Sequence, residues 1–102
     1  MKVFVLHKRS FLSGKENDFV SVYKEIRTAQ MSLVWDLYQD LQYFGADSIE
    51  ADVDLSRYDI PSLAEGTGGD FDFPAKEVYL WKGDKEYPNE YLRYKIEEHE
   101  LM

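Results

Sequence analysis

Apolar residues recur along the chain with two different periods, and each period predicts its own kind of element. Residues 2–7 (KVFVLH) are rich in apolar and β-branched side chains, and residues 77–82 (EVYLWK) resemble them, so both segments are expected to form strands. Residues 48–56 alternate strictly between apolar and polar or acidic side chains. This alternation predicts a strand with one buried face and one acidic, solvated face.

The segment 19–44 has its apolar side chains in steps of three and four, which is the period of an amphipathic helix. One continuous helix of this length would span about 39 Å, whereas a compact domain of about 100 residues is only about 33 Å across. Three arrangements therefore remain open: one overhanging helix, two helices broken at residues 27–32, or a strand over residues 19–23 followed by a helix. The buried helix face is expected to contain Leu33, Val34, Leu37, Leu41 and Phe44, packed on Val3, Val5, Val78 and Leu80.

Two further segments complete the expected fold. Residues 57–75 contain prolines and glycines and are expected to form an irregular loop. Residues 88–100 fit either a helix that begins at Pro88 or a strand, because Leu92, Tyr94 and Ile96 alternate with polar residues. The chain is thus expected to be one α+β domain, residues 1–102, roughly in the order β-α-β-β-α. Its sheet should be mostly antiparallel, with the helices packed on one face.

Composition removes several classes of protein. The chain contains no cysteine, which excludes disulfides, thiolate zinc sites, iron–sulfur clusters and cysteine nucleophiles. Its apolar runs are much shorter than a membrane-spanning helix requires, and Lys8 and Arg9 interrupt an N-terminal run that is too short for a signal peptide. We therefore expect a soluble, cytoplasmic protein that does not bind membranes.

The acidic residues are concentrated in the middle third of the chain. The formal net charge is −8, and residues 46–75 contain eight acidic residues and one basic residue. Such a segment repels nucleic acids and anionic lipids and attracts basic protein surfaces. The predicted partner-binding residues are Glu50, Asp52, Asp54, Asp70 and Asp72.

The sequence contains few signals of catalysis or metal binding. Gly66 to Gly69 resembles a phosphate loop, but no lysine follows and Pro74 opposes a helix there, so a turn is expected. The two Asp-x-Asp pairs have the oxygen ligands that divalent cations prefer, yet carboxylates two residues apart on a strand form a spread row. His7 and His99 have no recognisable nucleophile motif. We expect no catalytic residue, metal or cofactor.

The favoured function is that of a small acidic interaction or regulatory protein that binds a basic protein surface through its middle third. One alternative is a carboxylate-based metal-binding protein or enzyme, and another is a structural or assembly subunit without chemistry of its own. The overhanging helix also predicts a homodimer, because an exposed apolar face needs a covering surface. Tyrosine and tryptophan, which are frequent both in cores and in binding surfaces, are concentrated near the C-terminus.

Overall fold

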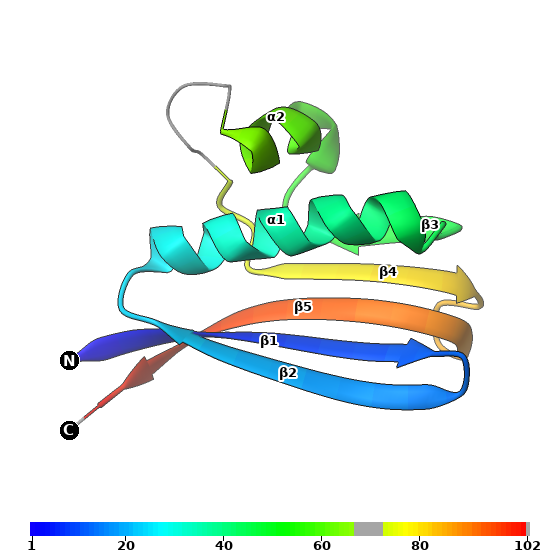
Figure 1. Cartoon of the computed structure of the whole chain (residues 1–102), viewed down its shortest axis with the longest axis horizontal. Coiled ribbons are helices and arrows are strands. Elements are labelled where there is room, and N and C mark those ends of the chain that lie inside the picture. The colour runs from blue at the N-terminus through cyan, green and yellow to red at the C-terminus, as the bar shows by residue number, and fades with distance from the viewer. Residues whose placement is uncertain (67–72, 102) are drawn as a thin grey trace.

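The computed structural model describes residues 1–66 and 73–101 and confirms the α+β class (Figure 1). The described elements, in chain order, are β1 (Lys2–Leu12), β2 (Lys15–Tyr23), α1 (Ile26–Tyr43), β3 (Ser48–Ala51), the short 3-10 helix η1 (Leu55–Arg57), α2 (Ile60–Glu65), β4 (Glu77–Gly83) and β5 (Pro88–Glu100). None of the helices in this part of the chain has the length and apolar character needed to cross a membrane.

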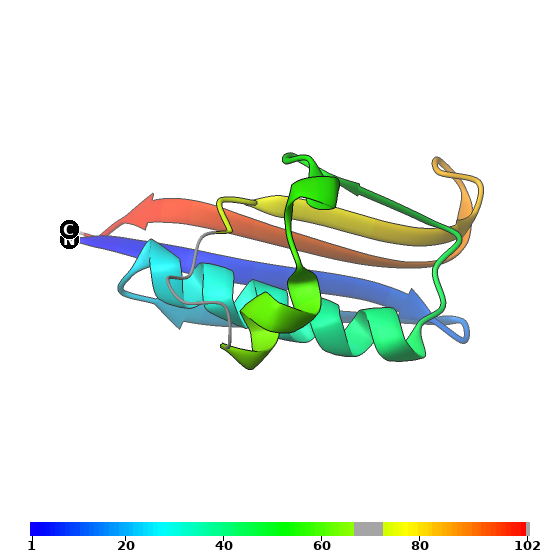
Figure 2. The same ribbon diagram turned by 90° about the horizontal axis from the view of Figure 1, so that it is seen from above.

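All five strands belong to one antiparallel sheet in the order β2-β1-β5-β4-β3. Both helices, α1 and α2, lie on the same side of this sheet (Figures 1 and 2). The first and last strands are neighbours, with Lys2 opposite Glu100 at one end and Phe11 opposite Tyr91 at the other. The two ends of the chain therefore lie side by side, and the amino group of Met1 donates a hydrogen bond to the carbonyl oxygen of Leu101.

The structure resolves the segment 19–44 as a strand followed by a helix. Residues 19–23 are the second half of β2, which forms a hairpin with β1, and α1 begins at Ile26. Ser13 and Gly14 connect the two strands, and both have positive φ angles, 53° and 76°. Two such residues give a tight turn whose twist matches that of the strands, and β2 can therefore pair directly with β1.

Residues 88–100 form a strand, so the alternation of Leu92, Tyr94 and Ile96 describes this segment and the helical alternative does not. All three side chains are buried against α1, because β5 lies in the middle of the sheet between β1 and β4. Residues 19–23 and 88–100, for which both a helix and a strand were considered, are therefore both in strands.

The middle of the chain departs most from expectation. The strand predicted over residues 48–56 ends at Ala51, and Asp54 instead begins η1. The loop expected over residues 57–75 contains α2, whose N-cap is Asp59 and whose C-cap is Gly66 with φ of 72°. Period-two alternation alone did not determine the strand length, because local capping by Asp54 competes with strand pairing.

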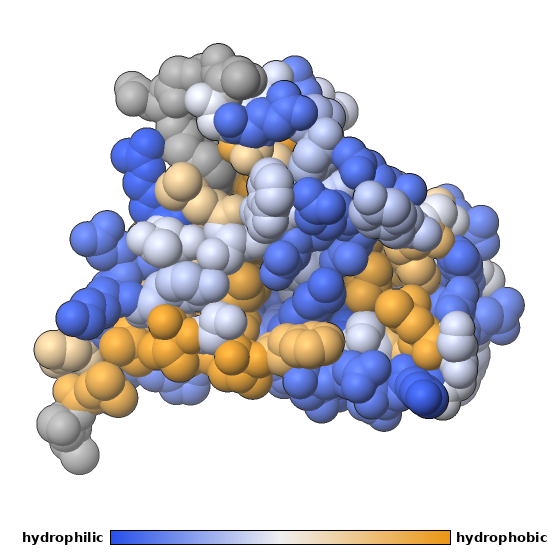
Figure 3. All heavy atoms as spheres, viewed as in Figure 1, coloured by the Kyte–Doolittle hydropathy of each residue, from blue (hydrophilic) through white to orange (hydrophobic). Residues whose placement is uncertain are grey.

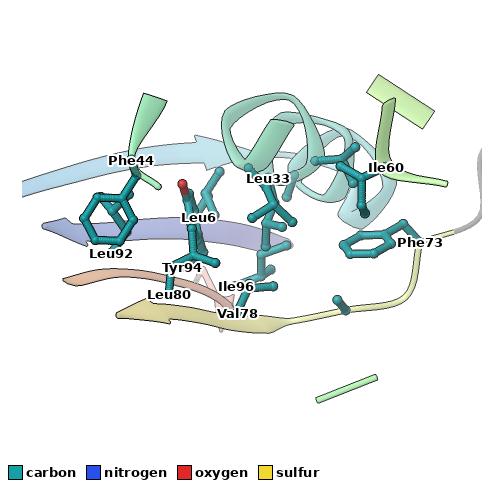
Figure 4. Packing of buried hydrophobic residues seen from close by; sticks show 14 residues of the cluster. Leu6, Leu33, Phe44, Ile60, Phe73, Val78, Leu80, Leu92, Tyr94 and Ile96 are labelled. Atoms are coloured by element: carbon teal, nitrogen blue, oxygen red, sulfur yellow. The ribbon is translucent and has the colours of Figure 1, made fainter. Parts of the chain in front are cut away.

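The core lies between α1 and the sheet (Figure 4). Leu33, Val34 and Leu37 of α1 are fully buried, and Phe44 is nearly so, as the helical period predicted. They face buried side chains from the central strands and from the segment before β4: Leu6, Phe73, Ala75, Val78, Leu80, Leu92, Tyr94 and Ile96.

The expected packing against α1 was wrong at three positions. Leu41 is 40% exposed, because it lies on the side of α1 that points away from the sheet. Val3 and Val5 alternate with Phe4 and Leu6, and it is the latter pair that packs toward α1. Val3 and Val5 therefore point to the opposite face of the sheet, where Val3 is still buried, at 7% exposure, and Val5 is partly buried.

Candidate binding face of the sheet

The face of the sheet opposite α1 is covered by none of the described helices, and we call it the open face (Figure 2). Successive side chains of a strand point to opposite faces, so the neighbours of the buried Leu92 and Tyr94 lie on the open face. The strand pairing then aligns three rows of side chains across β1, β5 and β4: Phe11 with Tyr91 and Trp81, Arg9 with Arg93 and Tyr79, and His7 with Lys95 and Glu77.

An aromatic cluster, Phe11, Tyr79, Trp81 and Tyr91, occupies one end of the open face. The ring centroids of Tyr79 and Trp81 are 4.8 Å apart with an interplanar angle of 22°, so these rings are stacked. Tyr91 continues the cluster, with its centroid 6.1 Å from that of Tyr79 and 6.2 Å from that of Phe11. All four side chains are only partly buried. The cluster therefore offers aromatic surface to a binding partner.

Cationic groups lie over and beside this cluster. The guanidinium of Arg93 lies 4.6 Å from the ring centroid of Tyr79, and the ammonium of Lys85 lies 5.9 Å from that of Trp81. Both distances fit cation–π interactions, which hold a flexible cation in place over a ring. The hydroxyl of Tyr79 donates a hydrogen bond to the carbonyl oxygen of Lys85, 2.9 Å away. Partial burial raises the pKa of Tyr79.

Arg9 and Arg93 are directly opposite each other on β1 and β5, but their charges are balanced differently. The Nε of Arg9 lies 3.0 Å from Asp18 and 3.6 Å from Glu16 of β2. Its hydrogen bond to Asp18 raises the pKa of Arg9 and lowers the pKa of Asp18. Among the residues that the structure describes, none forms an ion pair with Arg93.

A depression of about 670 Å³ lies at this end of the open face. Its floor includes Tyr79, Tyr91 and Arg93, and four carboxylates lie around it. These carboxylates, which we call the acidic rim, are Glu50, Asp52, Glu77 and Glu86. Glu50 forms an ion pair with Lys85 across the depression. The arrangement combines aromatic rings, exposed cations and exposed carboxylates within one shallow surface.

The structure separates the predicted partner-binding residues. Glu50 and Asp52 belong to the acidic rim, but only Glu50 lies on β3. Asp52 accepts hydrogen bonds from the backbone N–H groups of Lys76, at 3.1 Å, and Glu77, at 3.3 Å. It therefore fixes the entry to β4. The single acidic strand face that was expected does not form, because β3 ends before Asp52.

Asp54 has a local structural role. It accepts hydrogen bonds from the backbone N–H of Ser56, at 3.1 Å, and from its hydroxyl, at 2.7 Å. These bonds lower the pKa of Asp54. Asp70 and Asp72, the other predicted residues, lie outside the described part of the chain.

The described residues offer little for catalysis or for a metal. They contain no group of three or more histidine, cysteine, aspartate or glutamate side chains that could hold a metal ion. His7 lies 3.2 Å from Asp18, and His99 lies 3.2 Å from Glu97, all at the surface. Within this part of the chain, neither histidine hydrogen-bonds to a serine or tyrosine hydroxyl.

Sequence reasoning found only part of the open face. The concentration of tyrosine and tryptophan near the C-terminus indicates Tyr79, Trp81 and Tyr91, but not Arg93 or Phe11. The alternation of β5 contains the signal for Arg93: once Leu92, Tyr94 and Ile96 are inside, Tyr91 and Arg93 must be outside. In comparisons with known proteins, no family model, no curated protein and no solved structure matches the chain.

Proposed function

We propose that this chain is a binding protein whose open face, with the aromatic cluster, Arg93 and the acidic rim, contacts a protein partner that carries basic side chains. The observation that supports it best is the stacking of Arg93 on Tyr79 within a partly exposed cluster of tyrosine, tryptophan and arginine. This proposal keeps the expected class of function, an acidic interaction protein. It keeps Glu50 and Asp52 of the middle third, as part of the acidic rim, and adds the aromatic cluster and Arg93 of the open face.

Tyrosine, tryptophan and arginine contribute most to protein–protein binding because they bury a large area with few rotatable bonds. Here the aromatic rings are already stacked on one another and Arg93 is already held over a ring. Ordering these side chains on binding should therefore cost less conformational entropy than ordering free side chains would. A partner that covers the depression would also strengthen the cation–π contacts by removing water from them.

The charges around the cluster favour a protein over a nucleic acid. A polyanion would place phosphates against the acidic rim, and the net charge of −8 would repel it at long range. A protein partner can present basic side chains to Glu50, Asp52, Glu77 and Glu86, and a carboxylate or carbonyl group to Arg93. The same carboxylates would accelerate association with a basic partner at low salt.

Site-specific photocrosslinking in the source cells tests this proposal. A photoreactive amino acid replaces Tyr91 in one variant and Tyr43 in the control; Tyr43 is 82% exposed at the end of α1, away from the open face. The expected result is a crosslinked protein of defined mass at position 91 only. Equal crosslinking at position 43 would contradict the proposed surface.

Binding measurements with the crosslinked partner then test the individual side chains. Trp81→Ala and Arg93→Ala should each weaken binding by about ten-fold or more, the range of residues that dominate an interface, whereas Tyr43→Ala should have no effect. Replacing Glu50 and Glu77 by glutamine should slow association and reduce its dependence on salt. An unchanged affinity of both the Trp81 and Arg93 variants would rule out the open face.

A further inference from the structure

The two edges of the sheet are built differently. The β3 edge is only four residues long, contains Glu50 and is flanked by Asp47 and Asp52. A short edge strand with charged side chains discourages pairing with a strand of another molecule. The β2 edge is nine residues long and contains no proline. Its register against β1 is continuous from Leu12 opposite Lys15 to Phe4 opposite Tyr23. The first half of this edge contains the charged residues Lys15, Glu16 and Asp18, whereas its second half, residues 19–23, has neither charge nor proline and so lacks the usual protection.

The second half of this edge is apolar at the surface. Phe19, Val20 and Val22 are 57%, 60% and 61% exposed. Figure 3 shows hydrophobic surface gathered on the lower left of the molecule, where Figure 1 shows the end of β2 beside β1. One side of β2 is paired with β1, and as an edge strand it has backbone N–H and C=O groups on its other side. An exposed edge that is both unpaired and apolar is suited to adding another strand.

We propose that two copies of this chain pair through their β2 edges, antiparallel and related by a two-fold axis at Ser21, so that the two sheets become one. In this register Val20 lies opposite Val22 of the second copy, and Phe19 lies opposite Tyr23. Each of these apolar pairs occurs twice because the interface is self-complementary. Side chains directly opposite each other on antiparallel strands have Cβ atoms about 5 Å apart, which brings these pairs into contact.

Side-chain matching favours this register over its neighbour. With the axis at Ser21, Asp18 lies opposite Lys24, the residue that follows β2 in the second copy, which pairs opposite charges twice. With the axis at Val20, Glu16 would lie opposite Lys24, but Asp18 would lie opposite Val22 and Phe19 opposite Ser21, so the apolar pairs would be lost. The register at Ser21 thus matches apolar with apolar residues and acid with base, which is how a strand register is specified.

The helix side of the same edge offers a place for the aromatic side chain. Phe19 and Tyr23 both lie on the side of the sheet that faces α1, since Tyr23 is opposite Phe4, which packs against the core. A groove next to Tyr23 is lined by Met31 and Trp35 of α1, which are half exposed. Phe19 of the second copy would lie beside this groove and cover part of it. The proposed dimer thus buries apolar surface of α1 as well as of β2.

The absence of cysteine from the chain makes a direct test simple. In Ser21→Cys, the two introduced thiols face each other across the axis and should form an intermolecular disulfide under mild oxidation. Gln42→Cys is the control, because Gln42 is exposed on α1 and away from this edge. Faster disulfide formation in Ser21→Cys than in Gln42→Cys supports the register. If Ser21→Cys forms the disulfide at the same rate as Gln42→Cys, or more slowly, the register is overturned.

Sedimentation equilibrium of the full chain tests the dimer itself. The expected species has twice the 12.0 kDa mass of one chain. Val22→Asp should raise the dimer dissociation constant by about ten-fold or more, because it places two carboxylates opposite Val20. Tyr87→Asp is the matched control, since Tyr87 is 83% exposed and precedes β5, and it should leave the dimer intact. A single 12.0 kDa species at high protein concentration would overturn the proposal. Trp81→Ala, which changes the open face, should leave the dimer intact.

Discussion

Two aspartates one turn apart on α1 lie in different surroundings, and we expect opposite effects on folding from them. Asp40 accepts hydrogen bonds from the hydroxyl of the buried Tyr94 and from the ammonium of Lys8, 2.8 Å away. Among the described residues, none donates a hydrogen bond to the Asp36 carboxylate. Its burial, opposed in part by Lys8 and supported by the charge of Asp40, raises the pKa of its carboxyl group. An acid whose pKa is higher in the folded state destabilises the fold when it is ionised, so the cost of Asp36 is present at neutral pH and disappears in acid.

Asp36→Asn should therefore raise the unfolding midpoint at about pH 7, and the difference from the parent chain should vanish below about pH 4, where an ordinary aspartate is protonated. Asp40→Asn should lower the midpoint at neutral pH, because it weakens the bonds to Tyr94 and Lys8. Thermal unfolding followed by circular dichroism across this pH range measures both effects. Destabilisation by Asp36→Asn at neutral pH would contradict the assigned role of burial.

Leu37 and Leu41 are the same residue type on the same helix, and they test how the helix faces the sheet. Leu37 is fully buried, whereas Leu41 is 40% exposed. Leu37→Ala should lower the free energy of unfolding by about 2–5 kcal/mol, because it removes buried surface and leaves a cavity. Leu41→Ala should cost less than about 1 kcal/mol. Chemical denaturation gives both values, and equal losses would mean that the helix is rotated from the described orientation.

At the scale of elements, the sequence pattern identified the buried strands and the buried half of α1, but it was ambiguous where local and long-range interactions compete. Residues 19–23 suit a helix by their spacing and a strand by their β-branched composition. The turn at Ser13 and Gly14 settles the choice, since it places this segment beside β1. The strand 48–56 was predicted too long because the alternating pattern contains no information on hydrogen bonds such as those made by Asp52 and Asp54.

The turn between β4 and β5 depends on one glycine. Gly83 has a φ angle of 86° and lies where the register between these strands shifts. A Cβ atom at this position would lie 3.0 Å from the side-chain nitrogen of Asn89. Gly83→Ala should lower the free energy of unfolding by about 1–3 kcal/mol, from backbone strain together with this contact. Gly45→Ala is the control, because its φ is also positive, 64°, but the added Cβ meets no atom within 4 Å. Denaturation that shows the larger loss at Gly45 would contradict this account.

At the scale of the whole molecule, the fold class followed from the sequence, whereas the candidate site did not. Charge counting drew attention to the middle third, but two of the predicted carboxylates, Asp52 and Asp54, hold their own backbone in place. The open face is assembled from β1, β4 and β5, which are far apart in the sequence. Its composition could be recognised only once the register had placed Arg93 beside Tyr79. A site built from cross-strand neighbours is therefore invisible to a linear reading.

The net charge of −8 predicts how salt affects the whole molecule. Most ion pairs among the described residues join side chains that are about half exposed, such as Lys95 with Glu97, and exposed pairs contribute little to stability. Repulsion between the excess carboxylates should therefore dominate at low salt, and sodium chloride should raise the unfolding midpoint as it screens that repulsion. The experiment uses sodium chloride and not a sulfate salt, because sulfate also stabilises folded proteins by being excluded from their surface.

A charge reversal at Glu86 provides the matching variant for this salt experiment. Glu86 is exposed, and Glu86→Lys changes the net charge by two units, from −8 to −6. It should unfold at a higher temperature than the parent chain at low salt, and its midpoint should rise less between low salt and about 0.15 M, where the screening length is about 8 Å. Glu86→Asp keeps the charge and should behave as the parent chain does. A midpoint that falls as sodium chloride is added to the parent chain would mean that attractive ion pairs outweigh the repulsion of the carboxylates.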